Sequence, residues 1–202
     1  MHRFFSKLRL AGPIAAIALT MAATAAQAQK VYTIQSGRTT IVLDSGFVAA
    51  LGTLGVSPGT ISPGALGGGK VVFPITSGDI DPWTARAEIL HSGGLTLTAG
   101  TTKVRAENFI IDTTAAMPVV TAQVISGGKL LGRYPLFNLV PPSGLKLPLT
   151  FSGDTFHLPD GFKVTLTATG ASALNSIFNV KAFQPGFLIG SAAHVSAILA
   201  VN

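Results

Sequence analysis

The stretch RAEILHSGGLTLTAGTTKVRAENFIID, residues 86–112, decides the fold class. It consists of three strand-like runs separated by the turn sequences SGG and AGT. In the third run, apolar Val104 and Ala106 alternate with charged residues, which is the pattern of a strand with one face in the core and one in solvent. The alternation breaks at 108–111, NFII, where we expect a β-bulge or burial on both faces. These residues predict an antiparallel meander at the centre of the chain.

The segments on both sides of this stretch have the same character. Residues 119–125 and 129–139 predict a further hairpin, and KVYTIQSGRTTIVLD, residues 30–44, predicts an opening hairpin that turns at Ser36-Gly37-Arg38. Alternation in the last run, AAHVSAILAV, places four side chains in the core, those of Val195, Ala197, Leu199 and Val201. It leaves His194 and Ser196 on the other face.

A short helix is predicted at 45–55, because Phe47, Ala50, Leu51 and Leu54 have helical spacing and Asp44 or Ser45 can cap the first turn. Residues 56–69 are rich in glycine and proline and predict a surface loop.

The segment GALGGGK, residues 64–70, matches seven positions of the phosphate-binding motif G-x-x-x-x-G-K-[ST]. However, Val71 stands where a hydroxyl is needed, and a strand follows where a helix is needed. A nucleotide site is therefore rejected.

Residues 163–180 repeat the organisation of residues 40–56, with corresponding positions offset by about 123 residues. Two strand-helix-loop-strand units, at about 39–76 and 162–201, then flank the meander at 84–139. The predicted architecture is all-β, a single β-sandwich or barrel-like domain over residues 29–202 with two short helices.

The N-terminus has a basic segment, an apolar segment of about a dozen residues and the small-x-small sequence Ala26-Gln27-Ala28, the layout of a secretory signal peptide. We expect residues 1–28 to be this leader, with an uncleaved anchor as the alternative. The mature protein is then expected to be exported, to the periplasm, the cell surface or the extracellular medium, and to have no membrane span. The chain has no cysteine, so no disulfide or thiolate metal site can form.

The charge balance argues against nucleic-acid binding. The chain has 14 Lys and Arg against 8 Asp and Glu, but three of the basic residues lie in the leader, so the remainder has 11 against 8. These cations are spread singly, whereas nucleic-acid binding needs them clustered on one face.

Catalytic and metal signatures are absent from the sequence. His91, His157 and His194 lie far apart along the chain, and whether they meet in space stays open. Asp79 and Asp81 could share a hard cation, but no third acid is close, and we favour an Asp-rich turn in which Pro82 and Trp83 pack at the sheet margin. A non-enzymatic protein with no metal site is therefore expected.

One segment of the meander resembles a known family. HSGGL, residues 91–95, followed by alternating threonine and leucine, Phe109, Ile111, Val119 and Val124, resembles the haem-binding Hta-type domains of bacterial surface haem-uptake proteins. The resemblance implies an exported, β-rich domain in which a tyrosine coordinates haem iron and a histidine supports it. His91 matches that histidine, although Leu90 replaces the glycine before it, and the surroundings of Tyr32 do not match the family's tyrosine segment.

Two functions follow. The first is an exported module that acts by binding or assembly, through adhesion to an envelope component or self-association at sheet edges. The alternative is a carrier of haem or another apolar small ligand, with His91, Tyr32 and Tyr134 as candidate ligand-binding residues.

Overall fold

The computed structural model describes residues 30–200, so the expected signal peptide and Val201 lie outside the described residues. The elements in chain order are β1 (Tyr32–Leu43), α1 (Ser45–Thr53), β2 (Ser57–Ile61), β3 (Ala65–Gly67), β4 (Lys70–Asp81), β5 (Arg86–His91), β6 (Gly94–Ala99), β7 (Thr102–Asp112), β8 (Val119–Ser126), β9 (Lys129–Val140), β10 (Phe151–Ser152), β11 (Thr155–Leu158), β12 (Lys163–Leu166), α2 (Ala168–Phe178) and β13 (Leu188–Leu199).

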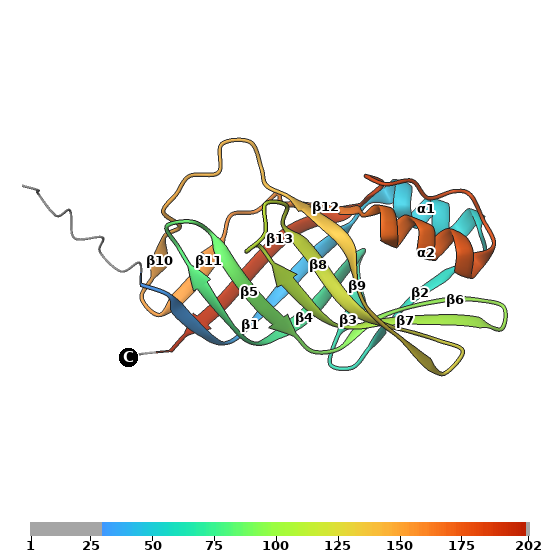
Figure 1. Ribbon diagram of the computed structural model, residues 1–202, viewed down its shortest axis with the longest axis horizontal. Coiled ribbons are helices and arrows are strands. Elements are labelled where there is room, and N and C mark those ends of the chain that lie inside the picture. Colours follow the sequence, from blue (N-terminus) through green and yellow to red (C-terminus); the bar gives the residue numbers. More distant parts are fainter. Residues whose placement is uncertain (1–29, 201–202) are drawn as a thin grey trace, which may run out of the picture.

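The strands form one antiparallel sheet that closes on itself. Its order is β1-β4-β5-β7-β8-β9-β12-β13, and β1 pairs with β13 as well as with β4. The remaining strands extend this closed sheet at its ends (Figure 1). The all-β prediction is confirmed, and the pairing of the first and last strands makes the domain barrel-like.

The core lies inside the closed sheet, because alternate side chains of each strand point inward. In β5, for example, Ala87, Ile89 and His91 are buried, while Arg86 and Glu88 are exposed. In β13 the predicted inward residues Val195, Ala197 and Leu199 are all buried. The central meander and the hairpin of β8 and β9 are confirmed, and so is the bulge: Asn108 has a φ of 53° and the register between β7 and β8 shifts there.

The opening hairpin predicted at 30–44 is wrong, because β1 is one continuous strand paired with two neighbours. Gly37, expected to make a turn, has a φ of 155°, and a Cβ at this position would clash with the carbonyl oxygen of Ser196. The glycine thus permits the close approach of β13 to β1. Close approach of a neighbouring backbone is a common reason for a glycine inside a strand.

Both predicted helices are present and both directly follow a strand. The Asp44 carboxylate accepts hydrogen bonds from the backbone N–H groups of Gly46 and Phe47 at the start of α1, and the Thr167 hydroxyl accepts one from Gly170 in α2. The helices lie together at one end of the sheet (Figure 1). Within residues 30–200, neither is long and apolar enough to cross a membrane.

Aromatic side chains fill the end of the sheet beneath the helices. The ring of Phe187 is 6.4 Å from that of Phe47 in α1 and 5.6 Å from that of Phe183, measured between centroids. The side-chain amide of Asn175 in α2 donates to the carbonyl oxygen of Phe183 at 2.8 Å and accepts from the N–H of Phe183 at 3.1 Å. Aromatic contacts therefore join α1 to the segment between α2 and β13.

Two loop predictions need correction. Residues 56–69, expected to be a loop, contain β2 and β3. β2 forms because its backbone groups pair with those of β6, and Pro58 is tolerated because β2 is an edge strand. The turn expected at 77–83 begins later, because β4 continues to Asp81. Asp81 accepts a hydrogen bond from the N–H of Trp83. Of the two residues expected to pack at the sheet margin, Pro82 is fully buried and the side chain of Trp83 is 45% exposed.

Candidate ligand-binding site

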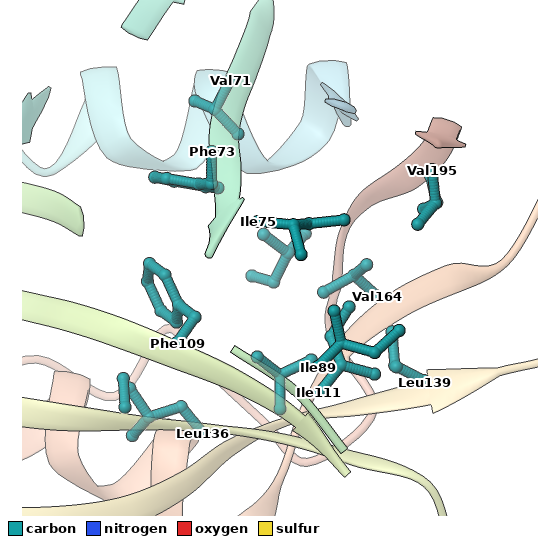
Figure 2. Close-up of a cluster of buried hydrophobic side chains, with 14 of the residues drawn as sticks. Val71, Phe73, Ile75, Ile89, Phe109, Ile111, Leu136, Leu139, Val164 and Val195 are labelled. Atoms are coloured by element: carbon teal, nitrogen blue, oxygen red, sulfur yellow. The ribbon is translucent and has the colours of Figure 1, made fainter. Parts of the chain in front are cut away.

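A cavity of about 360 Å³ lies inside the closed sheet. Its walls are mainly aliphatic and aromatic side chains contributed by every strand of the closed circuit. Figure 2 shows part of these walls, where side chains from different strands converge, among them Phe73, Phe109, Ile111, Leu139 and Val164. Both the size and the apolar lining are those of small-ligand sites in proteins.

The two ends of the cavity differ in exposure. At the end opposite the helices the lining includes the exposed residues Thr84, Arg86, Ala115 and Leu147, which belong to loops or strand ends. This end is the mouth. The opposite end of β5 carries His91, five residues and about 17 Å along the strand from Arg86, at a rise of about 3.4 Å per residue.

The segment 141–150 lies at the mouth and contributes Leu145 and Leu147 to the lining. It is held to the turn after β4 by the hydrogen bond from the N–H of Leu149 to the carbonyl oxygen of Pro82, 2.8 Å long. Leu149 is buried, whereas Leu147 is 47% exposed. Any ligand that enters at this end therefore passes beside Leu147.

The cavity wall includes the polar pair His91 and Thr39. The hydroxyl oxygen of Thr39 lies 2.8 Å from Nε2 of His91, and Nδ1 of His91 lies 3.3 Å from the carbonyl oxygen of Phe109. Because a carbonyl oxygen can only accept, Nδ1 carries the proton and Nε2 accepts from the Thr39 hydroxyl. Both side chains are buried, with exposed fractions of 4% for Thr39 and 5% for His91.

Burial lowers the pKa of His91 from 6.5 to about 4, because removing the imidazole from water penalises its charged form. The backbone hydrogen bond to Phe109 acts in the opposite direction and does not compensate. His91 is therefore neutral at pH 7, with an unprotonated nitrogen beside an apolar cavity.

The local sequence explains why these groups meet. The alternation of β5 turns His91 inward, and Thr39 is an inward residue of β1, two strands away across β4. The bulge at Asn108 resets the alternation of β7, so that Phe109 and Ile111 are both buried and both line the cavity.

The other candidate residues lie elsewhere. The Tyr32 ring packs on Phe151 with centroids 4.8 Å apart, and the Tyr134 hydroxyl donates to the carbonyl oxygen of Leu131 at 2.9 Å. Neither tyrosine lines the cavity with His91. Of the three histidines within residues 30–200, His157 and His194 come together, with ring centroids 5.6 Å apart, but neither lines the cavity.

Sequence reasoning did not identify Thr39, nor the aromatic walls Phe73, Phe109 and Phe137 as parts of a site. Thr39 could have been identified from the sequence, because it is a polar residue at an inward position of its strand, two residues from Gly37 and two from Ile41. Its partner His91, however, follows 52 residues later in the chain, and only the strand order brings the two together.

No protein-family model matches this sequence, and no curated protein matches it. Among solved structures, the C-terminal domain of HtaA from Corynebacterium glutamicum superposes with a TM-score of 0.62 and 17% identity, covering 84% of this chain and 99% of that one. The N-terminal domain of HtaA gives 0.60 and 11%, covering 83% and 99%. The heme binding protein HtaB from the same organism gives 0.57 and 10%, covering 85% and 96%. The resemblance inferred from residues 91–124 is thus confirmed, and the chain has the fold of the HtaA and HtaB domains.

Proposed function

We propose that this protein binds an apolar small molecule in the cavity inside its closed sheet, and that the ligand is haem. The observation that carries the proposal is the apolar cavity of about 360 Å³ with the neutral imidazole of His91 in its wall. The shared fold with HtaB, a heme binding protein, supports the choice of haem.

The residues of the cavity fit haem in three respects. Phe73, Phe109 and Phe137 provide the apolar and aromatic walls that a porphyrin needs. His91 provides an unprotonated nitrogen, the form in which imidazole binds metals. Arg86 at the mouth is the cation available to a ligand carboxylate.

In this proposal His91 supplies the nitrogen ligand, and a bound haem supplies an iron that accepts it. The hydrogen bond from Nδ1 to the Phe109 carbonyl oxygen orients the ring and fixes the tautomer, which is the usual role of such a bond behind a metal-binding histidine. Because the hydroxyl oxygen of Thr39 stands 2.8 Å from Nε2, where a metal bound to that nitrogen would lie, the Thr39 side chain would have to turn about its Cα–Cβ bond to free Nε2. Tyr32 and Tyr134 do not contact the ligand in this proposal.

The geometry favours this function over assembly at sheet edges. Pairing of β1 with β13 removes the edges of the main sheet, and a closed sheet offers no template to another chain along those strands. Among the described residues that line the cavity, none is Asp or Glu, so His91 has no carboxylate partner for general acid–base chemistry there. Binding is the activity that the site supports.

Titration of the purified apoprotein with hemin tests the proposal. We expect a Soret shift with wild-type protein and a different or absent shift with His91→Ala, because the nitrogen ligand is lost. The matched controls Tyr32→Phe and Tyr134→Phe should reproduce the wild-type spectrum.

A parallel titration with iron-free protoporphyrin separates cavity binding from iron ligation. Wild type and His91→Ala should both bind it, because the apolar walls are intact in both. No Soret shift in wild type would remove haem as the ligand, and a lack of binding to either porphyrin would contradict a porphyrin-sized cavity site.

A further inference from the structure

A pair of histidines lies on the outer face of the closed sheet. His157 in β11 and His194 in β13 have ring centroids 5.6 Å apart, and their rings are inclined by 54°. His157 is exposed and His194 is half-buried, and neither lines the cavity. A dissolved ion can therefore reach the pair without entering the ligand site.

The sheet determines the spacing of the two rings. His157 is directly opposite Ser196 in the pairing of β11 with β13. His194 lies two residues from Ser196 and so projects from the same face of β13. The histidines are thus diagonal neighbours on paired strands. Aromatic and long side chains at diagonal positions are close enough to contact each other.

We propose that His157 and His194 together bind one divalent transition-metal ion, with Cu²⁺ bound more tightly than Ni²⁺ or Zn²⁺. A metal at about 2.1 Å from an imidazole nitrogen lies about 3.2 Å from the ring centroid. Two imidazoles on one ion, at ligand angles from about 90° in tetragonal copper sites to about 120° in distorted tetrahedral sites, then have centroids about 4.5 to 5.5 Å apart. The observed 5.6 Å is within about 0.1 Å of the upper end of that range, so a small rotation of the exposed His157 ring brings both rings to one ion.

The pair supplies two ligands, and water would complete the coordination of a bound ion. Within residues 30–200 there is no group of three or more His, Asp or Glu that could hold a metal. The ranking of the metals follows from imidazole ligands, for which divalent affinity increases toward copper. Arg38 is paired with Ser196 across β1 and β13, and its positive charge weakens the site without blocking it.

The ion would join two strands that otherwise make a short pairing. β11 is paired with β13 over four residues, Thr155–Leu158, and Leu158 lines the cavity. Metal binding therefore stabilises a strand that contributes to the cavity wall.

Calorimetric titration of the whole chain with Cu²⁺, Ni²⁺ and Zn²⁺, without a polyhistidine tag, tests the site. Every protein carries His2→Gln, because His2 lies outside the described residues and is a competing imidazole. We expect one ion per chain and a higher unfolding temperature with metal. His157→Gln and His194→Gln should each weaken binding at least about tenfold, because one imidazole alone loses the gain of a linked second ligand, and the double variant should not bind an ion at this site.

Thr155→Ala, a change on the same face of β11, is the matched control and should bind as the His2→Gln parent does. Unfolding temperatures measured without metal show whether each variant is folded. Unchanged affinity in either single variant would overturn the proposal. The proposal would also be overturned if a single variant bound half as many ions as the parent with unchanged affinity. That is the result expected if the two imidazoles bind metal independently.

Discussion

At the scale of single residues, the protein places one histidine inside the sheet and two outside it, and their chemistry differs accordingly. His91 is kept neutral by burial, and its two nitrogens are both engaged by neighbours in the fold. His157 and His194 remain accessible to solutes. A histidine thus lines the cavity in one position and belongs to a surface pair in another. The alternation of side chains along each strand decides on which side of the sheet it lies.

The lowered pKa of His91 predicts that the free energy of unfolding falls in acid. Between pH 6.5 and about 4 the unfolded chain binds a proton at this residue and the folded protein does not, so stability decreases as the pH falls. The full contribution is about 3 kcal/mol, at about 1.4 kcal/mol per pKa unit, and it is complete once the pH is below about 4.

Urea unfolding at pH 7, 5.5 and 4.5 measures this dependence. His91→Gln should be less stable than wild type at pH 7 but should lose less stability on acidification. His157→Gln, which changes an exposed histidine, should retain the wild-type slope. Equal slopes for all three proteins would show that His91 is not the group responsible.

At the scale of elements, the parts that depend on local sequence were predictable and those that depend on strand partners were not. The meander, the capped helix after Asp44 and the bulge at Asn108 were predicted correctly, because alternation and capping are local signals. Gly37 was misread as a turn. A glycine is needed there because β13, about 160 residues later in the chain, packs closely against it. For the same reason His91 could be singled out from the sequence, but its pairing with Thr39 could not.

The cap of α1 supports a second prediction. Asp44→Ala removes the acceptor for the N–H groups of Gly46 and Phe47 and should lower the free energy of unfolding by about 1 kcal/mol. Thr53→Ala, at the other end of the same helix, removes a hydroxyl that bonds the carbonyl oxygen of Ala49 and should change stability by less than about 0.5 kcal/mol. Thermal unfolding of both variants measures the difference, and equal losses would refute a specific role for the cap.

At the scale of the whole molecule, the closed sheet brings the first and last strands together. Ile34 is paired with Leu199, and the N–H of Ala200 donates to the carbonyl oxygen of Thr33 at 2.8 Å. The two ends of the domain are therefore neighbours, and the order of strands around the sheet does not depend on where the chain is opened.

A circular permutant tests this reading of the fold. Joining the ends by a short linker and opening the turn at Gly127-Gly128, both with positive φ, should give a protein that unfolds cooperatively. Opening the chain between Ala192 and Ala193, inside β13, should not, because that strand pairs with β1, β11 and β12. Cooperative unfolding of both permutants, measured by circular dichroism, would contradict the central role of β13.

The pairing of β1 with β13 also sets the order of events during synthesis. β1 is made first, yet one of its two edges stays open until the last strand has left the ribosome, so the sheet cannot close on a growing chain. We propose that, if residues 1–28 direct export as the sequence predicts, this delay would keep the domain open for translocation. Closure of the sheet would then take place after translocation, and the ligand cavity would form only in the compartment where the protein works.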